Sequence, residues 1–295
     1  MRDLGRRSLI AIGSSYAVTL PKDWIKRVGG GKVRIVEGSS GELMILPDAN
    51  EHISKVSIDL GGMEEGLWEI IAAYLDGYDE IEIRKERMRR KDLETLKKAL
   101  SKLIGMEILE EGSSRILLRC LMDYSSVKPM ELLLRMKGII LGMLSDLRDA
   151  VAEGDKEMMS LVAERDDEVD KIYFALVRSI RKAMRSPEIM GMIGVDPINL
   201  LDMRIAAMIM ELIADNIVEL TQSNCDCIDL LKEISNLFDR GVRSFELKDF
   251  KGALEVRGRV NEIIKDLPAE KSLLPLINIL FRIEDLCDLV SPKFL

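Results

Sequence analysis

The chain has 295 residues, of which 47% are apolar, only 4% are aromatic and 17 are methionine, so it is too long for one small domain and suits packed helices better than a β-sandwich. Its single histidine, His52, excludes zinc or copper sites built on several imidazoles, and any Ser-His-Asp relay away from that position. The net charge of −8 is uneven, because residues 1–50 carry eight Lys/Arg against five Asp/Glu. A small basic segment ahead of an acidic remainder suggests a polyanionic partner for that segment.

Residues 1–49, which we call the head, are expected to form short strands around one short helix. The helix is predicted over Pro21–Val28, because proline is favoured in the first turn. A unit of this size with few aromatic residues buries little core alone, so we expect it to need a second copy of itself. Apolar and polar alternation predicts four strands, over Ser8–Ile12, Ala17–Leu20, Lys32–Val36 and Glu42–Leu46.

Residues 52–124 predict a middle domain with the element order β-α-β-α-β-β. Two helices are expected over Glu64–Asp76 and Arg90–Ile104, because Gly77 and Gly105 follow them as C-terminal caps. No residue in this segment suggests a functional site, and Trp68 is expected to be a packing anchor. The four strands are predicted over Lys55–Leu60, Glu80–Arg84, Met106–Glu110 and Arg115–Cys120.

From residue 126 onward the sequence predicts a bundle of long antiparallel helices joined by short loops. These helices read as two copies of three, with repeat one over about 126–224 and repeat two over about 226–290. Breaks are expected at Gly154-Asp155, Ser186-Pro187 and Asp196-Pro197. The six helices are predicted over about 128–153, 156–186, 198–223, 228–247, 250–267 and 272–290.

Carboxylates recur one helical turn apart on two helices of repeat one. Residues i and i+4 share a helix face, and an acid beside apolar positions costs free energy unless a cation neutralises it. Two interpretations stay open: a basic side chain close in sequence (Arg165, Lys171 or Arg204), or a hard metal ion such as iron, magnesium, manganese or calcium. The candidate ligands are Glu164, Asp166, Asp170, Glu211 and Asp215.

Repeat two lacks most of these acids. Where repeat one has Asp166, Asp170, Glu211 and Asp215, the aligned positions of repeat two are occupied by Arg257, Asn261, Phe281 and Asp285. A guanidinium group repels a cation, so we expect any bound ion to be confined to repeat one.

The segment from 126 to 295 resembles PhoU, the family of phosphate-uptake regulators. The resemblance rests on the two three-helix repeats and on the motifs E-R-D-D-E-V-D (164–170) and M-E-L-I-A-D (210–215). It implies that these carboxylates hold metal ions, often iron clusters, on the bundle surface. It also implies possible partners for the bundle, namely a phosphate transporter ATPase or a sensor kinase.

The head resembles the AbrB/MazE-type swapped-hairpin domain, through Ser14–Ile25 (S-S-Y-A-V-T-L-P-K-D-W-I) and the following K-V-R-I at 32–35. This resemblance implies a homodimer with interleaved hairpins that binds DNA. The whole arrangement is similar to the archaeal PhoU-type regulators. Basic and hydroxyl side chains suited to phosphate and base contacts are Arg6, Arg7, Ser14, Ser15, Tyr16, Lys22, Lys26 and Arg27.

The sequence therefore predicts a multidomain α+β protein, with a small swapped-hairpin β domain, a β-α-β-α-β-β middle domain and a six-helix PhoU-like all-α bundle. We expect a phosphate-responsive regulator that couples a dimeric DNA-binding head to a metal-binding sensor or docking bundle. The alternative is a protein-interaction regulator of a phosphate transporter or sensor kinase, whose head only dimerises. We expect no enzyme, because no phosphate-binding glycine loop, nucleophile elbow or HExxH motif occurs. No run is apolar enough to insert in a membrane, which predicts a cytoplasmic protein.

Overall fold

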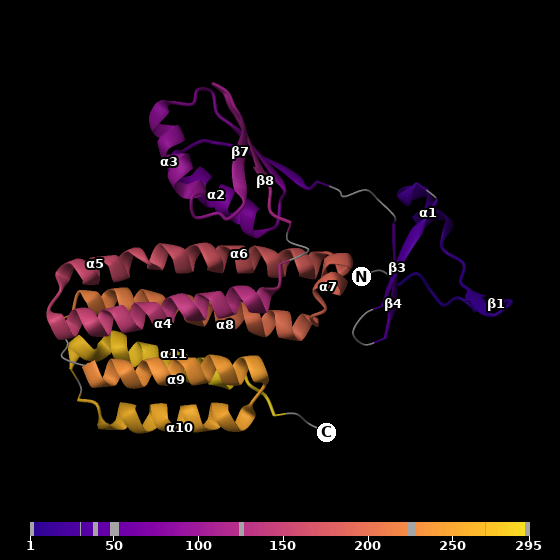
Figure 1. Ribbon diagram of the computed structural model, residues 1–295. Helices are drawn as coiled ribbons and strands as arrows, with labels where there is room; N and C mark the ends of the chain where they lie inside the picture. The colour runs from indigo at the N-terminus through magenta and orange to yellow at the C-terminus, as the bar shows by residue number, and fades with distance from the viewer. Residues whose placement is uncertain are drawn as a thin grey trace. The chain divides into compact units, whose positions relative to one another are not determined.

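The computed structural model describes residues 3–29, 31–37, 41–47, 53–123, 127–223, 228–268 and 270–292, so His52 lies outside the described residues. The chain divides into two compact units, Met1–His52 and Ile53–Leu295. The first unit is the head. The second contains both the segment predicted as a middle domain, here called the α/β part, and the helical bundle (Figure 1).

The head consists of two separate antiparallel hairpins and one helix. β1 (Ile10–Ile12) pairs with β2 (Ser15–Ala17), and β3 (Val33–Glu37) pairs with β4 (Leu43–Pro47). The helix α1 (Lys22–Val28) begins one residue later than predicted, since Pro21 is its N-cap residue, and Gly29 ends it in the left-handed conformation. None of the described head residues is buried, and large apolar side chains face solvent. The described residues of this unit therefore form no core of their own.

The α/β part has the predicted β-α-β-α-β-β order: β5 (Lys55–Asp59), α2 (Met63–Leu75), β6 (Glu80–Arg84), α3 (Arg90–Leu100), β7 (Met106–Glu111) and β8 (Arg115–Cys120). Its four-stranded sheet has the order β5-β6-β8-β7, with β5 parallel to β6 and the other pairs antiparallel. Alternate apolar residues of the strands form a core with α2 and α3, while the other face of the sheet carries mostly charged side chains.

Two predictions for this part are wrong. The helix α3 ends at Leu100 rather than Ile104, because residues 101–104 form a tight turn that leads into β7. Trp68 is not a packing anchor: it lies on the outer side of α2, and 70% of its surface is exposed.

The helical bundle packs its helices antiparallel in two groups (Figure 1). α4, α6 and α8 pack against one another, as do α9, α10 and α11, and the two groups meet where α4 contacts α9 and α8 contacts α11. The bounds are α4 Pro129–Glu153, α5 Lys156–Glu164, α6 Asp166–Arg185, α7 Pro187–Ile193, α8 Pro197–Thr221, α9 Ile228–Leu247, α10 Phe250–Asp266 and α11 Leu274–Asp288.

The helix boundaries correct the predicted set at three places. The single helix expected over 156–186 is two helices, α5 and α6, which meet at Arg165. The expected break at Ser186-Pro187 starts the short helix α7, because the Ser186 side chain accepts a hydrogen bond from the backbone of Ile189 and proline suits the first position. A short 3₁₀ turn, Lys271–Leu273, precedes α11.

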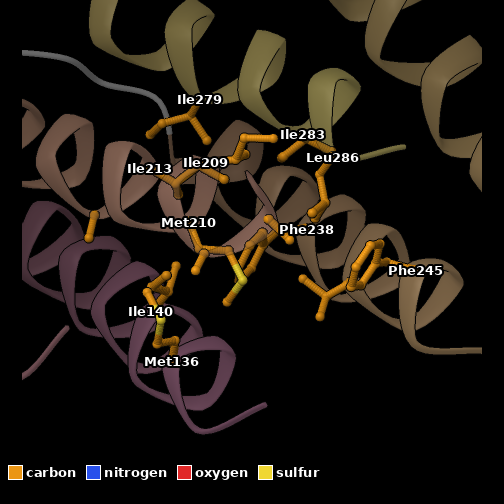
Figure 2. Close-up of a cluster of buried hydrophobic side chains, with 14 of the residues drawn as sticks. Met136, Ile140, Ile209, Met210, Ile213, Phe238, Phe245, Ile279, Ile283 and Leu286 are labelled. Carbon is orange, nitrogen blue, oxygen red and sulfur yellow. The ribbon is translucent and has the colours of Figure 1, made fainter. Parts of the chain in front are cut away.

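A continuous apolar core joins the two groups of helices (Figure 2). Met136 and Ile140 of α4 and Met210 of α8 lie on one side of Phe238 of α9, while Ile283 and Leu286 of α11 approach the same core from the other side (Figure 2). Unbranched methionine side chains fill the irregular space between these helices. Among the described helices, none is long and apolar enough to cross a membrane.

The C-terminal half of α6 fastens the α/β part to the bundle. Arg178 is fully buried there: its Nη1 donates to the carbonyl oxygen of Tyr74 at 2.5 Å, and its guanidinium carbon lies 4.8 Å from the Tyr74 ring centroid. Arg178 Nη2 also lies 3.6 Å from Asp79 Oδ1. Phe174, one turn earlier on α6, packs against the α/β core.

Two further ion pairs flank Arg178. Lys182 pairs with Asp79, and Arg181 Nη1 lies 2.7 Å from Asp76 Oδ1. Burial acts to raise the pKa of Asp79, but hydrogen bonds from Lys182 and Ser54 outweigh it and leave that pKa lowered. The α/β part is therefore held to α6 by a buried cation and by three charged neighbours, since Arg185 also pairs with Asp76.

A candidate carboxylate site on two helices

The structure brings the predicted carboxylates of repeat one together between α6 and α8. Asp166 and Asp170 lie one turn apart at the start of α6, and Glu211 and Asp215 lie one turn apart in α8, which packs against α6. Acids in the first turn of a helix interact favourably with its N-terminal dipole, which suits a helix start at Asp166. We call these four residues the acidic cluster.

Burial, and after it mutual repulsion, raises the pKa values of acids in this cluster. Burial, together with the charges of Asp170 and Asp215, raises the pKa of Asp166 to about 6. Burial and the charges of Asp215, Asp170 and Asp166 raise the pKa of Glu211 to about 7. The pKa of Asp215 is also raised, by burial and by Asp170. Carboxylates that share one site without enough cations behave in this way.

One oxygen of the cluster lacks a partner. Asp166 Oδ1 is buried and has no hydrogen-bond partner within the part of the chain that the structure describes. A buried carboxylate oxygen in this state is costly unless it is protonated or balanced by a cation. The acidic cluster could therefore accept a further cation.

The basic side chain that forms an ion pair with an acid of the cluster is Lys102, from the turn after α3, rather than Arg165, Lys171 or Arg204. Its Nζ lies 2.9 Å from Asp170 Oδ2 and 2.7 Å from Asp167 Oδ1. Arg165 instead pairs with Asp146, at 2.6 Å. A residue of the middle segment, from which the sequence predicted no site, thus contacts the candidate site.

The remaining acids and bases of the prediction lie at the edge of this arrangement. Glu164 is exposed at the end of α5, and Asp215, on α8, is the one member of the acidic cluster that is exposed. Arg204 stacks over the Tyr173 ring, 5.1 Å from its centroid, and its charge partly offsets the raised pKa of Glu211. Asp167, which the sequence did not single out, takes part through Lys102.

Repeat two has no equivalent of the acidic cluster at the aligned positions. Arg257 Nε lies 2.9 Å from Glu284 Oε1, and its Nη1 lies 3.0 Å from Asp288 Oδ1. Asn261 donates to the same Glu284, and Asp285 pairs with Arg282 at 2.7 Å. The acids there are neutralised by side chains of the same repeat.

The donor chemistry of the acidic cluster suits a hard cation, since every ligand is a carboxylate oxygen. As the side chains are placed, no group of three or more His, Cys, Asp or Glu residues among the described ranges has the arrangement of a formed metal site. The unpartnered Asp166 oxygen and the raised pKa values are the observations that fit a cation.

The candidate DNA-binding side chains of the head are all exposed. Arg6 and Arg7 precede β1, and Arg7 Nη1 donates to the Arg6 carbonyl oxygen at 2.9 Å. Ser14 lies in the turn between β1 and β2, where Ser15 and Tyr16 follow it on β2. The other three, Lys22, Lys26 and Arg27, lie on α1.

The fold and the site define a helical-bundle protein with a carboxylate cluster between two of its helices. Residues 133–223 match the model of the PhoU domain family, and this match supports a PhoU-type protein. The matched stretch runs from α4 to just beyond α8 and includes the whole acidic cluster; it reaches neither the head nor repeat two. Searches of curated proteins and of solved structures found no match.

Proposed function

We propose that this protein regulates phosphate uptake as a PhoU-type dimer whose head binds DNA and whose bundle responds to a metal ion. The observation that carries the proposal is the overlap between the PhoU match and the acidic cluster, since residues 133–223 contain both helices that bear the cluster. A regulatory bundle needs an element that responds to a ligand. The repelling carboxylates supply one.

A hard cation would be held by the carboxylates of Asp166, Asp170, Glu211 and Asp215. Bound there, the ion supplies positive charge that offsets their repulsion and satisfies Asp166 Oδ1. Lys102 already supplies one positive charge to Asp170, so ion and ammonium compete for this carboxylate. The all-oxygen donors favour iron, magnesium, manganese or calcium.

The head supports dimerisation and DNA binding in this proposal. Its apolar side chains are exposed at Ile10, Ile12, Ile35 and Leu43, to between 49% and 67%, and a second head would cover them. A dimer doubles the basic field of Arg6, Arg7 and α1, which favours phosphate contacts. Ion or partner occupancy of the bundle would then change the spacing of the two heads on DNA.

The experiment that tests the DNA part is a binding titration against the upstream region of the protein's own gene at several salt concentrations. Arg6→Ala with Arg7→Ala is expected to weaken binding and to flatten the log–log salt slope by about one unit for each lost phosphate contact. Lys251→Ala with Lys265→Ala, on exposed positions of α10, is the matched control and leaves the slope unchanged. Absence of binding at low salt would favour the alternative, in which the bundle docks a phosphate transporter ATPase or a sensor kinase.

A further inference from the structure

The two edge strands of the sheet in the α/β part differ in how readily they can pair with a further strand. β5 is one edge and β7 is the other. β7 carries Glu107, Glu110 and Glu111, and an irregularity between Ile108 and Glu110 interrupts its register. Charges and bulges of this kind discourage pairing of an edge strand. β5 is regular over its whole length and contains no proline.

The outward backbone groups of β5 can be identified from its bonds to β6. Leu60 donates its N–H to the Arg84 carbonyl oxygen, and the Ser54 carbonyl oxygen accepts from the N–H of Glu80. Backbone groups alternate along a strand, so the even-numbered residues from Ser54 to Leu60 face β6. The N–H and C=O groups of Lys55, Ser57 and Asp59 therefore face away from the sheet.

The charges across the sheet alternate up to this edge. In register, Glu107 of β7 faces Arg119 of β8, Arg119 faces Glu80 of β6, and Glu80 faces Lys55 of β5. Arg119 Nε lies 2.8 Å from Glu80 Oε1, and Lys55 Nζ lies 2.6 Å from Glu80 Oε2. This series of alternating charges across the sheet thus ends at Lys55, whose side chain remains 65% exposed. An acid on the next strand would continue the alternation.

The other end of β5 has the opposite charge. Asp59 is exposed on the same face of the sheet and lies in register with Arg84. If two β5 strands pair antiparallel with Ser57 opposite Ser57, each Lys55 lies opposite an Asp59, and each Val56 lies opposite an Ile58. In this register the outward-facing residues form the hydrogen-bonded pairs. Opposite charges directly across an antiparallel pair stabilise it.

We propose that β5 pairs antiparallel with β5 of a second copy of this chain, about a twofold axis through Ser57, and joins the two sheets into one. The partner is a second copy because one strand, Lys55–Asp59, carries both complementary charges in the positions that a twofold axis requires. The same operation at β7 would place acids against acids. The proposal does not depend on DNA binding, on the metal ion or on contacts of the head.

Disulfide trapping in the whole chain detects pairing of two β5 strands directly. It does so whether or not the heads also hold the dimer together. Hydrogen-bonded antiparallel pairs have Cα atoms about 5.5 Å apart, within reach of a disulfide. Ser57→Cys is expected to give a covalent dimer on a non-reducing gel after mild oxidation. The unmodified chain, which has four cysteines, and Glu107→Cys on the other edge are the controls. A Ser57→Cys chain that cross-links no faster than both controls overturns the proposal.

A charge change then tests the register. Asp59→Lys in the Ser57→Cys chain places lysine opposite Lys55 on both sides of the axis, and the cross-linking rate is expected to fall about tenfold. Added salt should raise the rate for Asp59→Lys, because it screens repulsion, and lower it where Asp59 is retained, because it screens attraction. Circular dichroism verifies that each variant is folded. Equal rates, or the same direction of salt dependence in both chains, would refute the pairing.

Discussion

Lys102 Nζ lies 2.9 Å from Asp170 Oδ2, so the cation that balances an acid of α6 comes from the α/β part of the same unit, 68 residues earlier in the chain. Burial acts to lower the pKa of Lys102, but hydrogen bonds to Asp167 and Asp170 outweigh it and leave that pKa raised. The ammonium group is therefore charged throughout the physiological pH range. It balances the charge of Asp170, one member of the acidic cluster, and leaves Asp166 and Glu211 to repel each other.

Replacing Lys102 is the first test of this relationship. Lys102→Met removes the competing cation, so Mn²⁺ should bind the acidic cluster at least about fivefold more tightly, as expected for loss of roughly one kilocalorie per mole of competition. Lys91→Met, an exposed base on α3, is the matched control and leaves Mn²⁺ affinity within about twofold. Titration calorimetry measures both. Equal affinities for the two variants would show that Lys102 does not compete with the ion.

Metal content should depend on repeat one alone. Asp166→Asn with Asp215→Asn removes carboxylates from both helices of the acidic cluster, so metal bound by protein purified without chelator should be lost. Asp285→Asn in repeat two leaves the metal content unchanged, because that carboxylate is paired with Arg282. Elemental analysis of the purified proteins measures the bound metal in each variant. Loss of metal only from the Asp285 variant would place the site in repeat two.

In metal-free protein the acidic cluster should contribute a pH dependence of stability opposite in sign to that of acids with lowered pKa values, such as Asp79. The pKa of Asp166 is about 6 and that of Glu211 about 7 in the folded chain, against about 4 when unfolded. Groups with raised folded pKa values contribute stability below pH 4 that is lost as pH rises to 7. Relative to the unmodified chain, Asp166→Asn with Glu211→Gln should gain about 1 kcal/mol at pH 8 and little at pH 4, after allowance for solvent screening. Urea unfolding at the two pH values measures this difference.

Replacing the buried Arg178 of α6 should lower the free energy of unfolding more than replacing its exposed neighbour Arg181. Arg178→Met removes a buried hydrogen bond to the Tyr74 carbonyl oxygen and the ring contact with Tyr74, and the free energy of unfolding should fall by about 2–4 kcal/mol. Arg181→Met, whose side chain is 42% exposed, should cost about 1 kcal/mol or less. Chemical unfolding curves compare the two. Similar losses would mean that burial of Arg178 adds nothing to the attachment of the α/β part.

Charged residues placed at the exposed apolar positions of the head should weaken the head dimer. Ile35→Glu with Leu43→Glu would bury carboxylates in the proposed contact, so the dissociation constant of the dimer should rise at least about tenfold. Leu109→Glu, on the β7 edge of the α/β part, is the matched control, since Leu109 is also exposed. Sedimentation equilibrium measures each constant. An unaffected dimer in the head variant would exclude the head from the interface.

Local signals predicted most elements, and long-range contacts account for the principal errors. Strands such as Glu80–Arg84 and Arg115–Cys120 were predicted to the residue, because alternation is a local pattern. The i, i+4 spacing likewise predicted that the carboxylates share a face. The contribution of Lys102 depends on how the turn after α3 packs against α6, and no local pattern specifies that contact. Trp68 was misplaced because its large apolar side chain resembles a core residue.

The burial of Arg178 determines where this chain can be divided for expression. A cut near residue 125 would separate α6 from Tyr74 and Asp79 and place a bare guanidinium group and Phe174 on the surface of each free bundle. Such fragments should aggregate or expand, whereas a cut near residue 53 follows the division between the two compact units. Laboratory fragments, and natural shuffling of this gene, should therefore keep the small sheet and the helices together.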